Sequence, residues 1–325
     1  MASAYNRSFH VPSFFSELKQ LDEVHINFDL HAAVDGLEEI ELGGKRSIVQ
    51  ILTKAARSGV RLADVFDQEL FETKLRRLAH GYRARYGDLL KYDVEEEIER
   101  FRGYRPELAK YAIDGLTFMY SAQTSNKNVI IEGANAVMLD VSMGSYPYVT
   151  SSNTTISGII AGLTLNPKNI TETIGVVKAW LEQSSRRLAE NGELLQVENA
   201  AVAGSVCQHP TLNLVVVKHG HMVNYYTSLN LTKASLARTT PTIAYKDKST
   251  GKELDYYPAD HNILDNAEVV YHEMPGWKKS TTNARTYDDL PKEARDYVEY
   301  IEKFIGVKIK WIGTGPDREA MITRG

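Results

Sequence analysis

Cysteine is almost absent from this sequence, and its rarity excludes an internal disulfide. Cys207 is the one cysteine among 325 residues, which suits a reducing compartment. No apolar run approaches the roughly 18 residues that a membrane-spanning helix needs, and the N-terminal MASAYNRSFHVPSFF lacks the apolar core of a secretory signal. The formal net charge of −4 provides no basic field for nucleic acid. We therefore expect a cytoplasmic protein without nucleic-acid or membrane partners.

Helix-like and strand-like segments alternate along the chain. Residues 26–42 have apolar side chains at helical spacing, and residues 63–121 form a helical subregion in which Pro106 is expected to open a helix. The charged run EEEIER within this subregion is interpreted as a solvated helix face. Pro291 is expected to open a last helix that ends at Gly306.

Strands are expected where hydrophobic residues run between turn residues. They are predicted at 129–132, 212–218, 222–226, 242–246, 269–272 and 307–312, with a hairpin turn at 249–252. A further strand-like segment surrounds Asp140, whose carboxylate we expect to be paired or to act as a cap. Helices mixed with hydrophobic strands predict an α/β fold, with a central, mostly parallel sheet flanked by helices. We expect residues 1–325 to form a single domain.

Small polar residues and glycines follow two of these strands. EGAN occupies residues 132–135, GTGP occupies 313–316, and hydroxyl or amide side chains fill 150–155. Ligands of open α/β sheets bind beyond the carboxyl ends of strands, where glycine permits close approach and hydroxyl groups can bind phosphate. The alternative is that both segments are tight turns and that 150–155 caps a helix beginning near Thr155. The local pattern alone favours that alternative.

Longer strings of residues are far more specific than these short motifs. IIEGANAVMLDVSMGSYPYVTSSNTTISG at 130–158 and the segment from MPGWKKSTTNARTYDDL to GTGPDREAMI at 274–322 closely resemble the adenylosuccinate synthase family. Shorter matches follow in family order at 10–18, 26–37, 53–66 and 225–233. The resemblance extends over residues 10–322. It implies the family's α/β fold, with the first strand of the family's sheet missing from this sequence.

The resemblance also implies an activity. Members of this family are ligases that join inosine monophosphate (IMP) to aspartate, using GTP and Mg²⁺, in AMP and hence purine nucleotide biosynthesis. They act as homodimers. Catalysis of this kind rests on positioning and on stabilising the charge of a transferred phosphoryl group.

The matched motifs imply which residues bind the substrates. IMP binding is assigned to Asn135, Thr150 and Arg57. Arg57 matches an arginine that crosses the family's dimer interface to the IMP phosphate, a task that suits a guanidinium fork. GTP binding is assigned to Lys233, in a match to the guanine-binding TKxD, and to Gly313, Thr314 and Gly315.

The sequence departs from the family pattern at its substrate loops. It contains neither the phosphate loop GDEGKGK nor the NNAGHT segment, so no catalytic residue and no metal ligand is assigned. IVQIL at 48–52 and VAGSVCQHPT at 202–211 stand where the family has substrate-binding loops, and Ser235 replaces the TKxD aspartate. We therefore expect an incomplete, catalytically impaired member of the family. The alternative is a non-catalytic homologue, or an incomplete gene product, that serves as a weak IMP-binding or dimerising scaffold.

Overall fold

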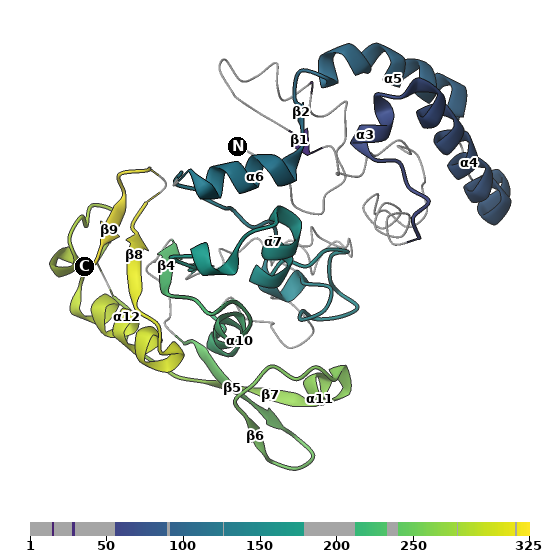
Figure 1. Ribbon diagram of the computed structural model, residues 1–325. Coiled ribbons are helices and arrows are strands. Elements are labelled where there is room, and N and C mark those ends of the chain that lie inside the picture. The colour runs from purple at the N-terminus through teal and green to yellow at the C-terminus, as the bar shows by residue number, and fades with distance from the viewer. Residues whose placement is uncertain are drawn as a thin grey trace. The chain divides into compact units, whose positions relative to one another are not determined.

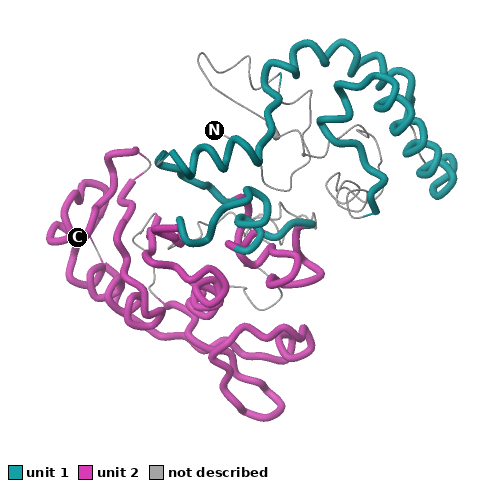
Figure 2. Tube along the Cα trace, viewed as in Figure 1, with its two compact units in different colours: residues 1–133, 151–153, 157–169 teal, residues 134–150, 154–156, 170–325 magenta. Residues whose placement is uncertain are grey.

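The computed structural model describes most of the chain. The described residues are 15, 28–29, 56–89, 92–125, 127–178, 212–232, 240–277, 279–315 and 317–325. Contacts between residues divide the chain into two compact units (Figure 2). The first unit comprises residues 1–133, 151–153 and 157–169, and the second comprises residues 134–150, 154–156 and 170–325.

The first unit is built mainly from helices (Figure 1). These are α3 (Leu62–Val65), α4 (Gln68–Tyr86), η1 (Gly87–Leu89), α5 (Val94–Leu108), α6 (Gly115–Thr124), most of α7 (Ile156–Leu163) and η3 (Pro167–Asn169). The side chains of Asp67, Asp93 and Asp114 accept backbone N–H groups in the first turns of α4, α5 and α6 and so fix where these helices begin. Two short strands, β1 (Phe28–Asp29) and β2 (Ala112–Ile113), pair in parallel.

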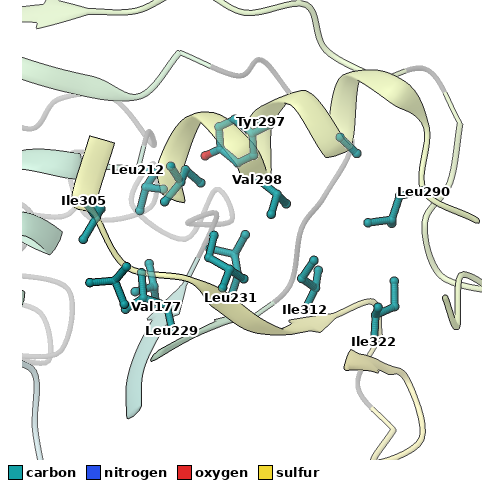
Figure 3. Close-up of a cluster of buried hydrophobic side chains, with 14 of the residues drawn as sticks. Val177, Leu212, Leu229, Leu231, Leu290, Tyr297, Val298, Ile305, Ile312 and Ile322 are labelled. Carbon is teal, nitrogen blue, oxygen red and sulfur yellow. The ribbon is translucent and has the colours of Figure 1, made fainter. Parts of the chain in front are cut away.

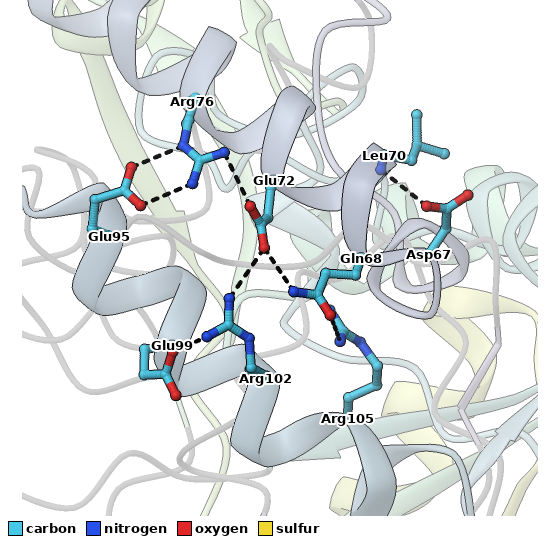
Figure 4. A network of polar contacts seen from close by, with 9 residues as sticks. All are labelled: Asp67, Gln68, Leu70, Glu72, Arg76, Glu95, Glu99, Arg102 and Arg105. Carbon is cyan, nitrogen blue, oxygen red and sulfur yellow. Dashed lines mark hydrogen bonds and ion pairs between the residues drawn. The ribbon is translucent and has the colours of Figure 1, made fainter.

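Helices α4 and α5 are joined by an apolar contact and by a polar network. The buried rings of Phe71 and Phe101 lie 5.1 Å apart between centroids. On the exposed side, Arg76 donates hydrogen bonds to both carboxylate oxygens of Glu95, at 2.8 and 2.9 Å, and forms an ion pair with Glu72 at 3.0 Å (Figure 4). The two helices are therefore linked by hydrophobic burial inside and by paired charges outside.

The second unit contains a four-stranded sheet. Its strands are β3 (Ile174–Lys178), β4 (Ser228–Thr232), β8 (Ile309–Gly313) and β9 (Met321–Thr323), in the order β3-β4-β8-β9. The first three strands are parallel, and β9 runs antiparallel to β8. Helix α12 (Lys292–Ile305) packs Tyr297 and Val298 toward Leu231 and Ile312 of the sheet (Figure 3). This contact forms the main hydrophobic core of the unit.

A smaller antiparallel sheet completes the second unit. Its order is β6 (Glu253–Leu254), β5 (Thr242–Asp247), β7 (Ala267–Tyr271). Helices α10 (Leu214–Asn224) and α11 (His261–Asp265) contribute to its core, in which Val215, Tyr245 and Leu264 are buried. The remaining turns are η2 (Val137–Leu139) and η5 (Tyr287–Asp289).

The predicted α/β class with a mostly parallel sheet is confirmed. Helix α12 begins after Pro291 and ends at Gly306, whose φ of +78° suits glycine. The predicted strands 242–246, 269–272 and 307–312 correspond to β5, β7 and β8, and the turn at 249–252 joins β5 to β6. The helix expected near Thr155 is α7.

Two predicted strands, 212–218 and 222–226, are wrong because this segment forms α10. The side chain of Asn213 accepts a hydrogen bond from the backbone N–H of Val216 at 3.2 Å and caps the helix. The helix buries Leu214 and Val215, so tertiary packing outweighs the strand preference of the β-branched run.

The buried strand predicted at 129–132 is also wrong. This segment pairs with no strand among the described residues, and the side chain of Ile130 is 95% exposed. A hydrophobic run forms a strand only where a neighbouring strand supplies hydrogen-bond partners. The strand predicted around Asp140 is likewise replaced by η2, a tight helical turn that ends at this residue.

Two predictions in the helical subregion are corrected. Phe28 and Asp29, inside the helix predicted at 26–42, form the strand β1, and the rest of that range lies outside the described residues. Pro106 lies in the last turn of α5 instead of opening a helix, and α6 begins after the cap Asp114. Because proline lacks an N–H group, α5 has no hydrogen bond from residue 106 to the carbonyl oxygen of Arg102, and the helix ends two residues later. No helix in the described part of the chain has the length and apolarity needed to cross a membrane.

Candidate nucleotide-binding loops

A buried aspartate organises the loop that follows η2. The side chain of Asp140 has no exposed surface. One oxygen accepts the backbone N–H groups of Ser142 and Met143 at 2.8 and 3.0 Å, and the other accepts those of Thr154 and Thr155 at 2.6 and 3.1 Å. Burial pushes the pKa of Asp140 upward, but the four N–H donors outweigh it, so the pKa lies below its ordinary value. The charged carboxylate thus ties the two ends of the loop together.

The chain between these ends is tightly packed. A Cβ atom added at Gly144 would lie 2.2 Å from the carbonyl oxygen of Met138, so only glycine fits there. The buried hydroxyl of Ser145 donates a hydrogen bond to the same oxygen at 3.1 Å. The Tyr146–Pro147 peptide bond is cis. The close packing at Gly144 and the hydrogen bond of Ser145 hold this loop in one conformation.

Two histidines hold the outer part of this loop. Nε2 of His219, on α10, donates to the carbonyl oxygen of Met143 at 2.8 Å. Nε2 of His261, on α11, donates to the carbonyl oxygen of Tyr146. The helices that cover the smaller sheet thereby also position the loop.

Asn135 lies shortly before this anchored loop, and Thr150 lies within it. The backbone N–H of Thr150 donates to the carbonyl oxygen of Leu139 at 2.8 Å. The hydroxyl of Thr154 donates to the carbonyl oxygen of Ala136 at 3.1 Å, directly after Asn135. Asn135 is exposed and has a φ of +68°, a left-handed conformation that is uncommon outside glycine and concentrates at functional sites. The two predicted IMP-binding residues therefore belong to one rigid element.

The second predicted loop follows β8. Thr314 is buried, its N–H donates to the carbonyl oxygen of Ala320 at 2.8 Å, and its hydroxyl donates to that of Ala284 at 3.1 Å. A Cβ atom added at Gly315 would lie 3.0 Å from the Cβ of Ala320. The hydroxyl of Thr314 is engaged by this hydrogen bond to Ala284. The Gly313–Gly315 loop would therefore contact a ligand through its backbone groups.

The other predicted binding residues do not belong to either of these two loops. Arg57 belongs to the first unit, is exposed, and has a φ of +60°, so it shares with Asn135 a left-handed backbone. Lys233 and Ser235 lie outside the described residues. Within the described ranges, no group of three or more histidine, cysteine, aspartate or glutamate side chains could hold a metal ion.

Comparison with known proteins identifies the family. A family model described as adenylosuccinate synthetase matches residues 9–322. The chain belongs to the adenylosuccinate synthetase family. It is 54% identical to the adenylosuccinate synthetase of Fusarium vanettenii and 51% identical to that of Neurospora crassa, in each case over 97% of this chain and 82% of the relative. A structure of fully ligated adenylosuccinate synthetase from Plasmodium falciparum superposes with a TM-score of 0.82 at 29% identity, covering 98% of this chain and 83% of that one.

The expectation that the carboxylate of Asp140 is paired or acts as a cap is confirmed by its four backbone N–H donors, but the sequence did not reveal which groups these are. A second anchor was missed altogether. The side chain of Asn224, at the end of α10, accepts the N–H of Ile156 at 2.8 Å and donates to the carbonyl oxygen of Gly220 at 3.0 Å. The first of these bonds joins residues 68 positions apart, and no local motif indicates such a contact.

Proposed function

We propose that this chain has the activity of its family, the GTP-dependent ligation of IMP and aspartate to adenylosuccinate in AMP biosynthesis. The family match over residues 9–322 carries this proposal, and the identity of 54% to a protein named for that activity supports it. The single cysteine, Cys207, favours a reducing setting, and we place the reaction in the cytoplasm.

For IMP, the proposed contacts are Asn135, Thr150 and Arg57. The amide of Asn135 suits a base or ribose edge, and the hydroxyl of Thr150 suits the 5′-phosphate. Arg57 is proposed to reach the IMP phosphate of a second copy of the chain, which makes the active form a homodimer. The anchored loop that contains Thr150 supports the assignment of Thr150, and the left-handed backbone of Asn135, a conformation that concentrates at functional sites, supports that of Asn135.

For GTP, the proposed contacts are Lys233 and the Gly313–Gly315 loop. The loop would face the guanine with backbone groups, because the hydroxyl of Thr314 already donates to Ala284. Ser235 cannot accept from guanine N1 and N2 as a carboxylate would. We therefore propose that selection of GTP over ATP is weak in this chain, and that Ser235→Asp raises the ratio of GTP to ATP affinity by about tenfold.

The reaction joins the aspartate amine to carbon 6 of IMP. Loss of the N1 proton lets the 6-oxygen attack the γ-phosphate of GTP, GDP leaves, and the amine then displaces phosphate from carbon 6. Mg²⁺, which this family uses, neutralises phosphate charge during such transfers. The described residues do not form a metal site, so we assign no step to a metal-bound group. The proposed part of Asn135 and Thr150 is to orient the purine and its phosphate for this attack.

We infer further that this 325-residue chain turns over slowly. IVQIL at 48–52 and VAGSVCQHPT at 202–211 lack the threonine and arginine that the family resemblance places in its substrate loops. Loss of one charge-stabilising donor typically lowers kcat about 100- to 1,000-fold. Asn135, Thr150 and Arg57 remain as the proposed contacts for IMP, and only Arg57 is charged. We therefore expect a dissociation constant of about 1 mM for IMP.

An assay of adenylosuccinate formation from IMP, aspartate, GTP and Mg²⁺ tests both statements. We expect turnover at least about 100-fold below that of the Neurospora crassa relative under the same conditions. Equal turnover would refute the impairment and leave the ligase activity standing. Absence of any saturable IMP binding in a magnetic-resonance titration would refute the proposed function itself.

A further inference from the structure

An open groove lies along α4 in the first unit, and the proposed function does not use it. Its volume is about 360 Å³, within the range of small-molecule sites. Leu78, Gly81 and Tyr82 form part of its lining on α4, and Ala56 and Ser58 contribute from the segment before α3. Leu78 and Tyr82 are half-buried, so the groove has an apolar and aromatic floor. A Cβ atom at Gly81 would meet nothing within 4 Å, so the space above this position is open.

Two arginines from the same helix complete the lining. Arg77 and Arg85 are both exposed and stand two helical turns apart, on either side of Tyr82. The guanidinium carbon of Arg85 lies 5.2 Å from the ring centroid of Tyr86, a cation–π contact that restrains it. The ring of Tyr86 in turn stacks on Tyr82, with centroids 5.9 Å apart. One aromatic side chain of the lining, Tyr82, thus lies between two cationic residues along the helix.

These two arginines differ from Arg76 and Lys74 of the same helix, which have carboxylate partners, and from Arg83, which donates to the carbonyl oxygen of Tyr92. Arg76, the neighbour of Arg77, is held between Glu72 and Glu95 (Figure 4). Lys74 pairs with Asp64 at 2.9 Å. Among the residues that the structure describes, neither Arg77 nor Arg85 has a carboxylate partner. The helix therefore neutralises its charge toward α3 and α5 and leaves positive charge at the groove, where concave surfaces concentrate anions.

We propose that this groove binds an organic phosphate, with Arg77 and Arg85 supplying the positive charge that attracts the phosphate and an aromatic body against Leu78 and Tyr82. A guanidinium fork binds two oxygens of a phosphate or a carboxylate, and two arginines favour phosphate because it has a third acceptor oxygen and a greater negative charge. The half-buried Tyr82 offers a ring face for stacking. Burial raises the pKa of the Tyr82 hydroxyl, with a further contribution from Tyr86 that outweighs the opposing charge of Arg85, so at neutral pH this hydroxyl remains a hydrogen-bond donor.

Binding of phenyl phosphate, inorganic phosphate and phenol to the full chain tests the proposal by ³¹P and ¹H magnetic resonance. Phenyl phosphate carries the phosphate and the ring without a purine, so it separates this groove from the proposed IMP site. We expect it to bind at least about threefold more tightly than inorganic phosphate, and phenol not to saturate. The Arg77→Gln, Arg85→Gln double variant should weaken phenyl phosphate at least about tenfold.

Two further variants show whether phenyl phosphate binds in this groove, at the proposed IMP site, or only through the positive charge of the helix. Arg83→Gln removes the same charge from the same helix but from a side chain that donates to the carbonyl oxygen of Tyr92, and it should leave binding unchanged. Arg57→Gln alters the proposed IMP arginine, which lies between Ala56 and Ser58, and should also leave it unchanged. Loss of binding in Arg57→Gln with retention in the double variant would overturn the proposal. So would equal affinity for phenyl and inorganic phosphate, or no saturable binding by wild type. Each of these results leaves the ligase activity untouched.

Discussion

One carboxylate oxygen of Asp140 accepts the backbone N–H of Thr154 at 2.6 Å, although 14 positions separate the two residues. This bond and its neighbour from Thr155 close a loop that contains Thr150 and that begins five residues after Asn135. A buried charge with four N–H donors is favourable only while all four are aligned on it. The precision of the proposed IMP site therefore depends on a residue that we do not expect to touch IMP.

Replacing Asp140 by Asn should destabilise the protein. The amide would place N–H groups where one carboxylate oxygen now accepts two backbone donors, which leaves those donors buried and unsatisfied. We expect the free energy of unfolding to fall by about 2–4 kcal/mol, measured by urea denaturation. Asp255→Asn is the matched control, because Asp255 is 79% exposed and makes a single ion pair at 3.3 Å. Equal effects of the two substitutions would contradict the anchoring role.

The contribution of Asp140 should depend on pH. Because its pKa is lower in the folded state than its unfolded value of about 3.9, its stabilisation is present above that value and is lost as the pH falls through the folded pKa. The difference in unfolding free energy between wild type and Asp140→Asn should therefore be constant near pH 6 and shrink below about pH 4. Denaturation series at pH 6 and pH 3 measure it. A difference that stays constant down to pH 3 would show that the folded pKa is not depressed by these hydrogen bonds.

Gly144 should tolerate no side chain. An alanine Cβ would lie 2.2 Å from the carbonyl oxygen of Met138 and 2.5 Å from that of Asp140, so the backbone must shift. We expect Gly144→Ala to lower the free energy of unfolding by more than about 2 kcal/mol. Gly103→Ala, inside α5 and with nothing within 4 Å of its Cβ, should instead raise it by about 0.5–1 kcal/mol. Thermal unfolding of the two variants should move in opposite directions.

Two substitutions at Asn135 separate its backbone from its side chain. Asn135→Gly keeps the left-handed backbone at no steric cost and removes the amide, so stability should be kept while IMP binding weakens by about tenfold. Asn135→Ala removes the amide and should also lose about 1 kcal/mol of stability, because alanine disfavours a φ of +68°. Magnetic-resonance titration with IMP and urea denaturation give the two readouts. Unchanged IMP affinity in both variants would remove Asn135 from the site.

The sequence by itself determined the family. It also determined those helices, strands and turns whose boundaries are marked by residues within the same segment. Pro291 and Gly306 bracket α12, and a glycine turn separates β5 from β6, because proline and glycine act through their own backbones. Long aperiodic strings located the segments that carry Asn135, Thr150 and Gly313–Gly315, since so many matched positions do not arise by chance. The two loops were thereby found before their conformation was known.

Tertiary structure decided what depends on partners distant in the sequence. LVVVK at 214–218 is helical because Leu214 and Val215 are buried on one side of α10, and β3 and β4, which were not predicted, are strands because they pair with each other. Hydrophobic runs supply the same driving force to either element, so the available neighbours make the choice. Whether a charged side chain is neutralised also depends on residues that are distant in the sequence. Arg76 and Arg77 are adjacent in the sequence, yet Glu95 of α5 neutralises Arg76, while Arg77 faces the groove with its charge unpaired among the described residues.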